Sequence, residues 1–239
     1  MSDSSPAHEA LAALAAVRAT IAAAELGAGR AAGSVHLVAV SKTQAAPAIR
    51  PLLLAGQRRF GENRVQEAKS KWTQLRQDFP DARLHLIGPL QTNKVRDAMA
   101  LFDVIETIDR PKLARAVADE MDRSGRRPHC LVQVNVGREP QKAGIDPDQT
   151  AALVDLCRRE YHLPLTGLMC IPPAEGDPVP HFRTLAGLAA SLGLEEVSMG
   201  MSADYPQAIL CGATQVRVGS ALFGRRQDRQ TVAGSAVGQ

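Results

Sequence analysis

Aromatic residues are scarce in this 239-residue chain, at 3% of the total. Proteins that hold single-stranded nucleic acid stack its bases on exposed aromatic rings, so this scarcity argues against such a surface. Basic and acidic residues nearly balance, at 28 and 25, and the net charge is only +3. The basic residues are scattered, and we expect most to cover solvated helix faces, with a small local excess available for an anionic ligand. We therefore expect no nucleic-acid partner.

The four cysteines and six histidines form no pattern typical of a disulfide framework or a metal site. The cysteines are far apart and include no CxxC, which predicts reduced and mostly buried thiols. No HExxH spacing occurs. The N-terminus lacks the basic segment and long apolar core of a signal peptide, and no window of about 18 residues is both apolar and uncharged. We expect a cytoplasmic protein without a membrane span or a metal.

Short apolar segments alternate with helical segments along the whole chain. We expect strands at 34–40, 58–61, 83–87, 103–107, 129–135, 165–169, 196–199 and 214–218. We expect helices at 7–27, 47–55, 62–75, 91–99, 109–123, 147–160, 181–192 and 204–210. Eight such repeats favour the α/β class and a parallel sheet closed as a single (β/α)8 TIM barrel. An open doubly wound sheet is the competing architecture, although no GxGxxG follows the first strand.

No linker composition divides the chain, so one barrel domain is expected over residues 1–224. Residues 225–239 are polar and rich in small residues, and we expect them to form a disordered tail. Within a barrel, chemistry occurs at the carboxyl ends of the strands. Unusual polar residues follow most of the predicted strands at that end, including Lys42, Glu62, Asn63, Thr107, Asp109 and Asn135.

Lys42 lies two residues beyond the first predicted strand. From its position alone it is either a lysine that extends from a strand end into solvent, or an amine partly desolvated in the barrel mouth. Desolvation favours the uncharged amine, which attacks carbonyl groups. Because one lysine cannot decide between these interpretations, the decision depends on what surrounds it.

The loops after the last two predicted strands favour a phosphate site. Barrels often bind phosphate there, and residues 198–202 and 218–220 are rich in Gly and Ser. Small residues let backbone N–H groups approach an anion, and hydroxyl groups add donors. Asp204 is expected to cap the short helix that follows, and Asp109 another helix with Pro111 in its first turn. Arg217, inside an apolar strand, pairs either with a carboxylate or with a ligand heteroatom.

Several motifs, in order and covering about residues 36–224, resemble the YggS/PROSC family of pyridoxal 5'-phosphate (PLP) homeostasis proteins. They are AVSKTQ (39–44), FGENRVQEA (60–68), LHLIGPLQTNK (84–94), TIDR (107–110), VQVNVG (132–137), KAGI (142–145), GLMCIPP (167–173), SMGMSADYPQAI (198–209) and VRVGSALFG (216–224). The resemblance implies a fold like the N-terminal domain of alanine racemase. It implies no firmly established catalytic reaction.

The resemblance also implies the role of each site residue. It implies that Lys42 carries PLP as a Schiff base, that Asn63 lies beside the cofactor, that Arg217 faces the pyridine nitrogen, and that the phosphate is held by Ser202, Gly219 and Ser220. The chain differs from many relatives at Arg64, where Tyr is common, at Ala203, where some have Asp, and at Ser220, where Thr is common. Serine keeps the hydroxyl group, so the expected phosphate site is unaffected.

Three functions remain open at this point. The first is a PLP carrier acting in intracellular PLP homeostasis, with PLP-dependent apoenzymes as candidate recipients and a monomer as the expected state. The second is a PLP-dependent amino-acid racemase, which needs a second acid or base. The third is a Schiff-base aldolase without PLP. The lysine's position after the first strand and the family motifs argue against the aldolase.

Overall fold

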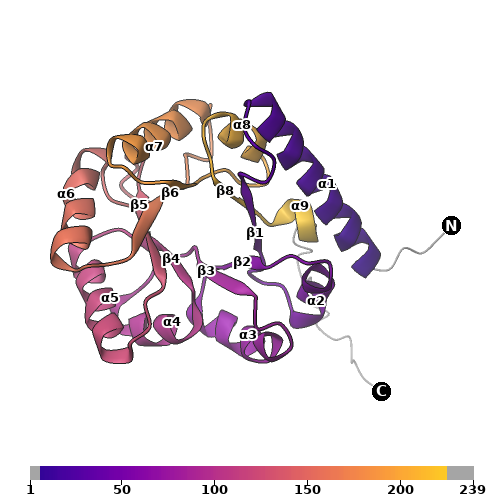
Figure 1. Ribbon diagram of the computed structural model, residues 1–239, viewed down its shortest axis with the longest axis horizontal. Helices are drawn as coiled ribbons and strands as arrows, with labels where there is room; N and C mark the ends of the chain where they lie inside the picture. The colour runs from indigo at the N-terminus through magenta and orange to yellow at the C-terminus, as the bar shows by residue number, and fades with distance from the viewer. Residues whose placement is uncertain (1–5, 225–239) are drawn as a thin grey trace, which may run out of the picture.

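Eight parallel strands form a closed barrel in which β8 pairs back onto β1. The structure is a computed structural model that describes residues 6–224. Figure 1 shows the strands at the centre and the helices around them. The strands are β1 (His36–Val40), β2 (Arg59–Glu62), β3 (Arg83–Leu86), β4 (Val104–Ile108), β5 (His129–Val134), β6 (Leu165–Cys170), β7 (Glu196–Ser198) and β8 (Gln215–Val218). The predicted (β/α)8 barrel is confirmed, and the predicted tail lies outside the described residues.

The helices cover the outer face of the barrel (Figure 1). They are α1 (Pro6–Gly27), α2 (Ala46–Leu54), α3 (Val65–Asp78), α4 (Val95–Leu101), α5 (Pro111–Ser124), α6 (Thr150–Asp155), α7 (Val179–Ser191), α8 (Tyr205–Leu210) and α9 (Ser220–Phe223). Single turns of 3-10 helix, η1 (Thr92–Lys94) and η2 (Pro147–Gln149), precede α4 and α6, and a π-helical segment, η3 (Leu156–Glu160), continues α6. The predicted helix at 147–160 is thus one continuous segment of three types, and α9 was not predicted.

Three capping and boundary predictions were wrong. Glu62 was expected to begin a helix, but it is the last residue of β2, where it pairs with Leu86. Asp109 was expected to cap α5, but the N-cap residue is Arg110 and no side chain caps the helix; the Asp109 carboxylate forms an ion pair with Arg110. Asp204 does occupy the N-cap position of α8, but its carboxylate accepts a hydrogen bond from a backbone N–H on the preceding turn.

Helix α1 packs along the outside of the barrel beside α2, α8 and α9. By length and composition alone it is apolar enough to cross a membrane, with a mean hydropathy of 1.5. Such a test is also passed by helices that pack on a protein core. Leu14, Val17 and Ile21 are buried along one face of α1, which accounts for three of its large apolar residues as packing contacts.

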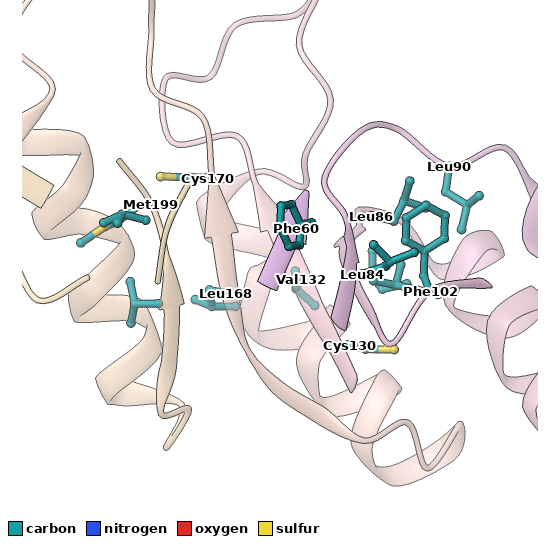
Figure 2. Close-up of a cluster of buried hydrophobic side chains, with 14 of the residues drawn as sticks. Phe60, Leu84, Leu86, Leu90, Phe102, Cys130, Val132, Leu168, Cys170 and Met199 are labelled. Atoms are coloured by element: carbon teal, nitrogen blue, oxygen red, sulfur yellow. The ribbon is translucent and has the colours of Figure 1, made fainter. Parts of the chain in front are cut away.

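Most of the hydrophobic core lies between the sheet and the helices. Figure 2 shows part of it, with Phe60, Leu84 and Phe102 among the buried side chains. Phe60 also packs against the indole of Trp72, with ring centroids 4.9 Å apart. A contact of this kind contributes about 0.5–1.5 kcal/mol beyond the buried area itself. This outer core holds the strands in register and so fixes the loops at the barrel's carboxyl end.

Candidate functional site

A cavity of about 400 Å³ opens at the carboxyl ends of the strands. Its volume lies within the usual range for small-molecule sites. All six residues predicted to hold the cofactor line this one cavity: Lys42, Asn63, Ser202, Arg217, Gly219 and Ser220. They come from the loops after β1, β2 and β7 and from β8 and its following loop. Closure of the barrel between β1 and β8 brings the first and last of them together.

The loop that carries Lys42 is held by two side chains of α3. Lys71 donates to the carbonyl oxygen of Ser41 at 2.7 Å and to the Glu67 carboxylate at 2.9 Å. Glu67 in turn accepts the backbone N–H of Thr43 at 2.5 Å. Thr43 has a φ of 65°, a left-handed conformation that costs energy for a β-branched residue. The two α3 side chains therefore stabilise the unusual backbone that follows Lys42.

The buried Glu62 carboxylate also holds the loop that carries Lys42. Its Oε1 accepts the Ser41 hydroxyl at 2.5 Å and the Trp72 indole N–H at 2.9 Å, and it lies 3.0 Å from Lys71 Nζ. Burial raises the pKa of Glu62, and these partners only partly offset that effect. Because Glu62 and Lys71 are both almost inaccessible, their charges depend on each other.

Arg217 is buried in β8 with its guanidinium at the cavity. It donates to the hydroxyl of Ser198 and to the carbonyl oxygen of Cys170, both at 2.7 Å. The Glu106 carboxylate lies 4.0 Å away. The sequence left open whether Arg217 pairs with a carboxylate or faces a ligand. Its guanidinium lies near the Glu106 carboxylate and also lines the cavity, so the position is compatible with both roles. A buried guanidinium keeps its proton, so this wall of the cavity is cationic.

A chain of buried polar groups crosses the barrel interior behind Arg217. Ser198 donates to Glu106 at 2.6 Å, although β7 and β4 are not neighbours in the sheet, so this bond spans the interior. The other oxygen of Glu106 lies 2.6 Å from His85 Nδ1. Burial by itself raises the pKa of Glu106, but His85, Arg217 and Ser198 outweigh it and leave the pKa below its ordinary value. Glu106 is thus the counter-charge of Arg217.

Hydrogen-bond donors gather in the loops after β7 and β8, which line the same cavity. The Ser202 hydroxyl oxygen accepts the N–H of Gly219 at 3.2 Å and of Ala221 at 3.3 Å. This ties the loop after β7 to the loop after β8 and leaves the Ser202 hydroxyl proton available to a ligand. Within the described part of the chain, the N–H groups of Ser202 and Ser220 have no partner. Such a group of donors is suited to a phosphate.

Two glycines allow the close contacts that shape the cavity. A Cβ at Gly88 would lie 2.2 Å from the backbone oxygen of Asn63, so only glycine lets the loop after β3 reach Asn63. Gly200 has a φ of 89°, and a Cβ there would lie 2.5 Å from Ala208 Cβ. Glycine adopts such conformations without strain. Both positions set the path of loops that carry site residues.

Some polar residues expected at this mouth have other roles. Thr107 is a buried residue within β4, and it does not line the cavity. Asn135 does follow β5, but its side chain exchanges hydrogen bonds with the backbone of Glu139. It therefore shapes a turn, and we assign it no ligand contact.

Residues behind the cavity were missed by the sequence reasoning. His85, Glu106 and Ser198 support Arg217, and Lys71 and Glu67 hold the lysine loop. One signal was present in the strand Val-Ile-Glu-Thr-Ile at 104–108, because a carboxylate in a fully buried strand needs a cationic or hydrogen-bonding partner. The identity of that partner follows from barrel closure and was not readable locally.

The residues present fit PLP. A flexible amine stands at Lys42, unpartnered N–H donors stand at the loops after β7 and β8, and a buried cation stands at Arg217. Apolar side chains line the rest of the cavity, among them Ile87 and Ile171, which suits a flat aromatic ring. Such a donor set matches an aldehyde, a phosphate and a ring heteroatom on one ligand.

Comparison with known proteins supports this interpretation. Residues 13–227 match the family model of the alanine racemase N-terminal domain. The chain is 41% identical over 220 residues to the pyridoxal phosphate homeostasis protein of Vibrio cholerae, covering 88% of this chain and 93% of that one. Its structure resembles PipY of Synechococcus elongatus PCC7942 with PLP bound, with a TM-score of 0.76 and 40% identity over 85% of this chain and all of that one.

Similarity to alanine racemase itself is more distant. The Clostridium difficile enzyme superposes with a TM-score of 0.66 at 14% identity, covering 83% of this chain but only 54% of the racemase. That likeness shows a shared barrel and nothing about the reaction. With matches to a family model and to relatives over most of its length, the chain belongs to the family of pyridoxal phosphate homeostasis proteins, built on the alanine racemase N-terminal barrel.

Proposed function

We propose that this protein binds PLP as a Schiff base on Lys42 and acts in intracellular PLP homeostasis. The observation that carries the proposal is one cavity in which a lysine amine, free N–H donors and a buried arginine converge. PLP supplies an aldehyde that condenses reversibly with an amine. Lys42 provides the amine, and the residues at Ser202, Gly219 and Ser220 hold the phosphate. Asn63 lines the same cavity beside the ring position.

Arg217 favours storage of the cofactor over catalysis with it. Its charge is permanent and is balanced by Glu106, so a pyridine nitrogen that faces it stays unprotonated. An unprotonated ring withdraws electrons weakly and supports carbanion chemistry poorly. PLP held in this way remains exchangeable through attack by another amine. We propose PLP-dependent apoenzymes as recipients, and a monomer as the solution state; light scattering on the purified protein measures the latter.

Borohydride trapping tests the proposal directly. Purified protein is incubated with PLP, reduced and digested, and the modified peptide is mapped. We expect phosphopyridoxyl on Lys42, loss of the label in Lys42→Ala, and an unchanged label in Lys112→Ala, which removes an exposed lysine on α5. A wild-type protein with no Schiff-base absorbance after addition of PLP, or with the label spread equally over surface lysines, contradicts the proposal.

An amino-acid racemase is the alternative function. A racemase of this fold needs a second acid or base near the cofactor, commonly a tyrosine. The chain has two tyrosines, Tyr161 and Tyr205. Neither lines the cavity, and Tyr205 is buried at the start of α8. Formation of D-alanine from L-alanine by the purified protein, abolished in Lys42→Ala, would replace the carrier proposal with this one.

A further inference from the structure

The amino ends of the strands form a second, strongly basic mouth. Two adjoining cavities of about 680 and 530 Å³ open there and share Arg83 and Asp81 in their walls. Seven arginines and three carboxylates line them, an excess of four positive charges. That excess is larger than the net charge of the whole chain, +3. The arginines that are scattered in sequence are therefore gathered by the fold at one end of the barrel.

Five of the seven arginines have partners within residues 6–224. Each donates to a carbonyl, carboxylate or amide oxygen; the five are Arg18, Arg58, Arg76, Arg126 and Arg127. Arg59 and Arg83 differ, because neither guanidinium has a hydrogen bond or an ion pair among the described residues. They begin the neighbouring strands β2 and β3 and stand directly opposite each other in register.

This pairing of like charges is unfavourable for the fold. Cations directly opposite each other on adjacent strands repel. Burial lowers the pKa of Arg59, and the charge of Arg83 lowers it further. At His36, on the adjacent strand β1, burial lowers the pKa and Arg59 lowers it again. Arg59 is partly buried and Arg83 is exposed, and neither guanidinium has a carboxylate partner, so the pair offers free donors to an anion.

The carboxylates near this pair are already engaged. Asp81 pairs with Arg58. Glu25 accepts the N–H groups of residues 33 and 35 and a serine hydroxyl. Glu196, whose charge also acts on Arg59, accepts from Thr166 and Gln215. Glu196 partly offsets the repulsion at Arg59 through its charge, but neither Arg59 nor Arg83 forms an ion pair with any of these carboxylates.

We infer that the amino-terminal mouth of the barrel binds a small phosphate-bearing anion, with Arg59 and Arg83 as its principal ligands. Neighbouring strands lie roughly 4.8 Å apart, so two guanidinium groups that start opposite each other can share one phosphate group. Guanidinium donors match phosphate oxygens in paired hydrogen bonds. The concave shape favours a small molecule over a flat acidic protein surface, and the site lies at the opposite end of the barrel from Lys42.

Calorimetric titration with inorganic pyrophosphate at low ionic strength tests this site. The protein is first saturated with PLP, so that the hydrogen-bond donors of the Lys42 cavity are occupied. A second titration without PLP then counts the pyrophosphate sites at both ends of the barrel. We expect one pyrophosphate site in the PLP-saturated protein, with affinity reduced roughly ten-fold or more in Arg59→Gln/Arg83→Gln. The double variant Arg115→Gln/Arg183→Gln, which removes two exposed helix charges, is the matched control and should bind as wild type.

Thermal melting separates a binding role from a structural one. Because Arg59 and Arg83 repel each other, the Gln variant without ligand should melt at the wild-type temperature or above it, and pyrophosphate should no longer raise that temperature. A variant that melts well below wild type, or that binds pyrophosphate as tightly, overturns the inference. Binding of a short polyglutamate peptide without binding of pyrophosphate also overturns it, in favour of an acidic protein partner. None of these readouts depends on Lys42.

Discussion

Replacing Lys71 with methionine removes a buried cation that lies beside two carboxylates and the loop of Lys42. Lys71 Nζ donates to Ser41, Gln44 and Glu67, and it lies 3.0 Å from Glu62. Methionine matches the volume of the lysine stem but supplies no donor. The variant therefore leaves a buried carboxylate without its counter-charge and the Gln44 carbonyl oxygen without its donor, while the Ser41 carbonyl oxygen keeps only the Gln44 N–H.

Removing one partner from a buried ion pair typically costs about 3–5 kcal/mol. In a chain of this size each kcal/mol shifts the melting temperature by about 2–4 °C, so we expect a fall of roughly 6–20 °C. The penalty depends on pH because Glu62 can take up a proton. Burial already raises the pKa of Glu62 in the folded state, so protonation favours folding below the ordinary carboxyl pKa. Loss of Lys71 should hence cost most near neutral pH and less at acid pH.

Urea unfolding, followed by the fluorescence of the single tryptophan, measures the loss of stability. Trp72 is buried and donates to Glu62, so its fluorescence reports on this cluster. A double-mutant cycle with Glu62→Gln isolates the pair, and we expect the double variant to be more stable than the sum of the two single effects implies. PLP binding to Lys71→Met should also weaken, because the loop of Lys42 loses its support. A loss below about 1 kcal/mol, or additive effects, would refute the reasoning.

Three further changes test other parts of the structure. The pKa of Glu106 is lowered, so its contribution to stability is present above the ordinary carboxyl pKa and is lost as pH falls; in Glu106→Gln, melting temperatures should fall less steeply on acidification. Gly200→Ala should cost about 1–3 kcal/mol and weaken PLP binding, whereas Gly187→Ala in α7, with open space around it, should be neutral or stabilising in urea unfolding. Burial raises the pKa of the Cys170 thiol to about 12, and Cys211 is the one cysteine of the four that is not buried, so a native thiol titration at mild alkaline pH should count one reactive group.

The sequence predicted the strands, the barrel and the cavity residues, but little of what holds those residues in place. The apolar strand segments and the position of Lys42 after β1 are local signals. The Gly/Ser loops near the end of the chain predict a phosphate site only once a barrel is assumed, because barrels often bind phosphate in those loops. The bond between Ser198 and Glu106 spans the interior and depends on closure of all eight strands. The pairing of Arg59 with Arg83 depends on the register of β2 and β3, which no local pattern encodes.

Pairing of β1 with β8 makes the cavity depend on closure of the whole barrel. Lys42 follows the first strand, and the residues proposed to hold the phosphate follow the last two, so a chain in which β8 has not paired with β1 has the lysine without those residues beside it. Ligand that binds only the finished barrel stabilises the closed topology by mass action. Protein with bound PLP should thus lose β8 to proteolysis more slowly than the empty form.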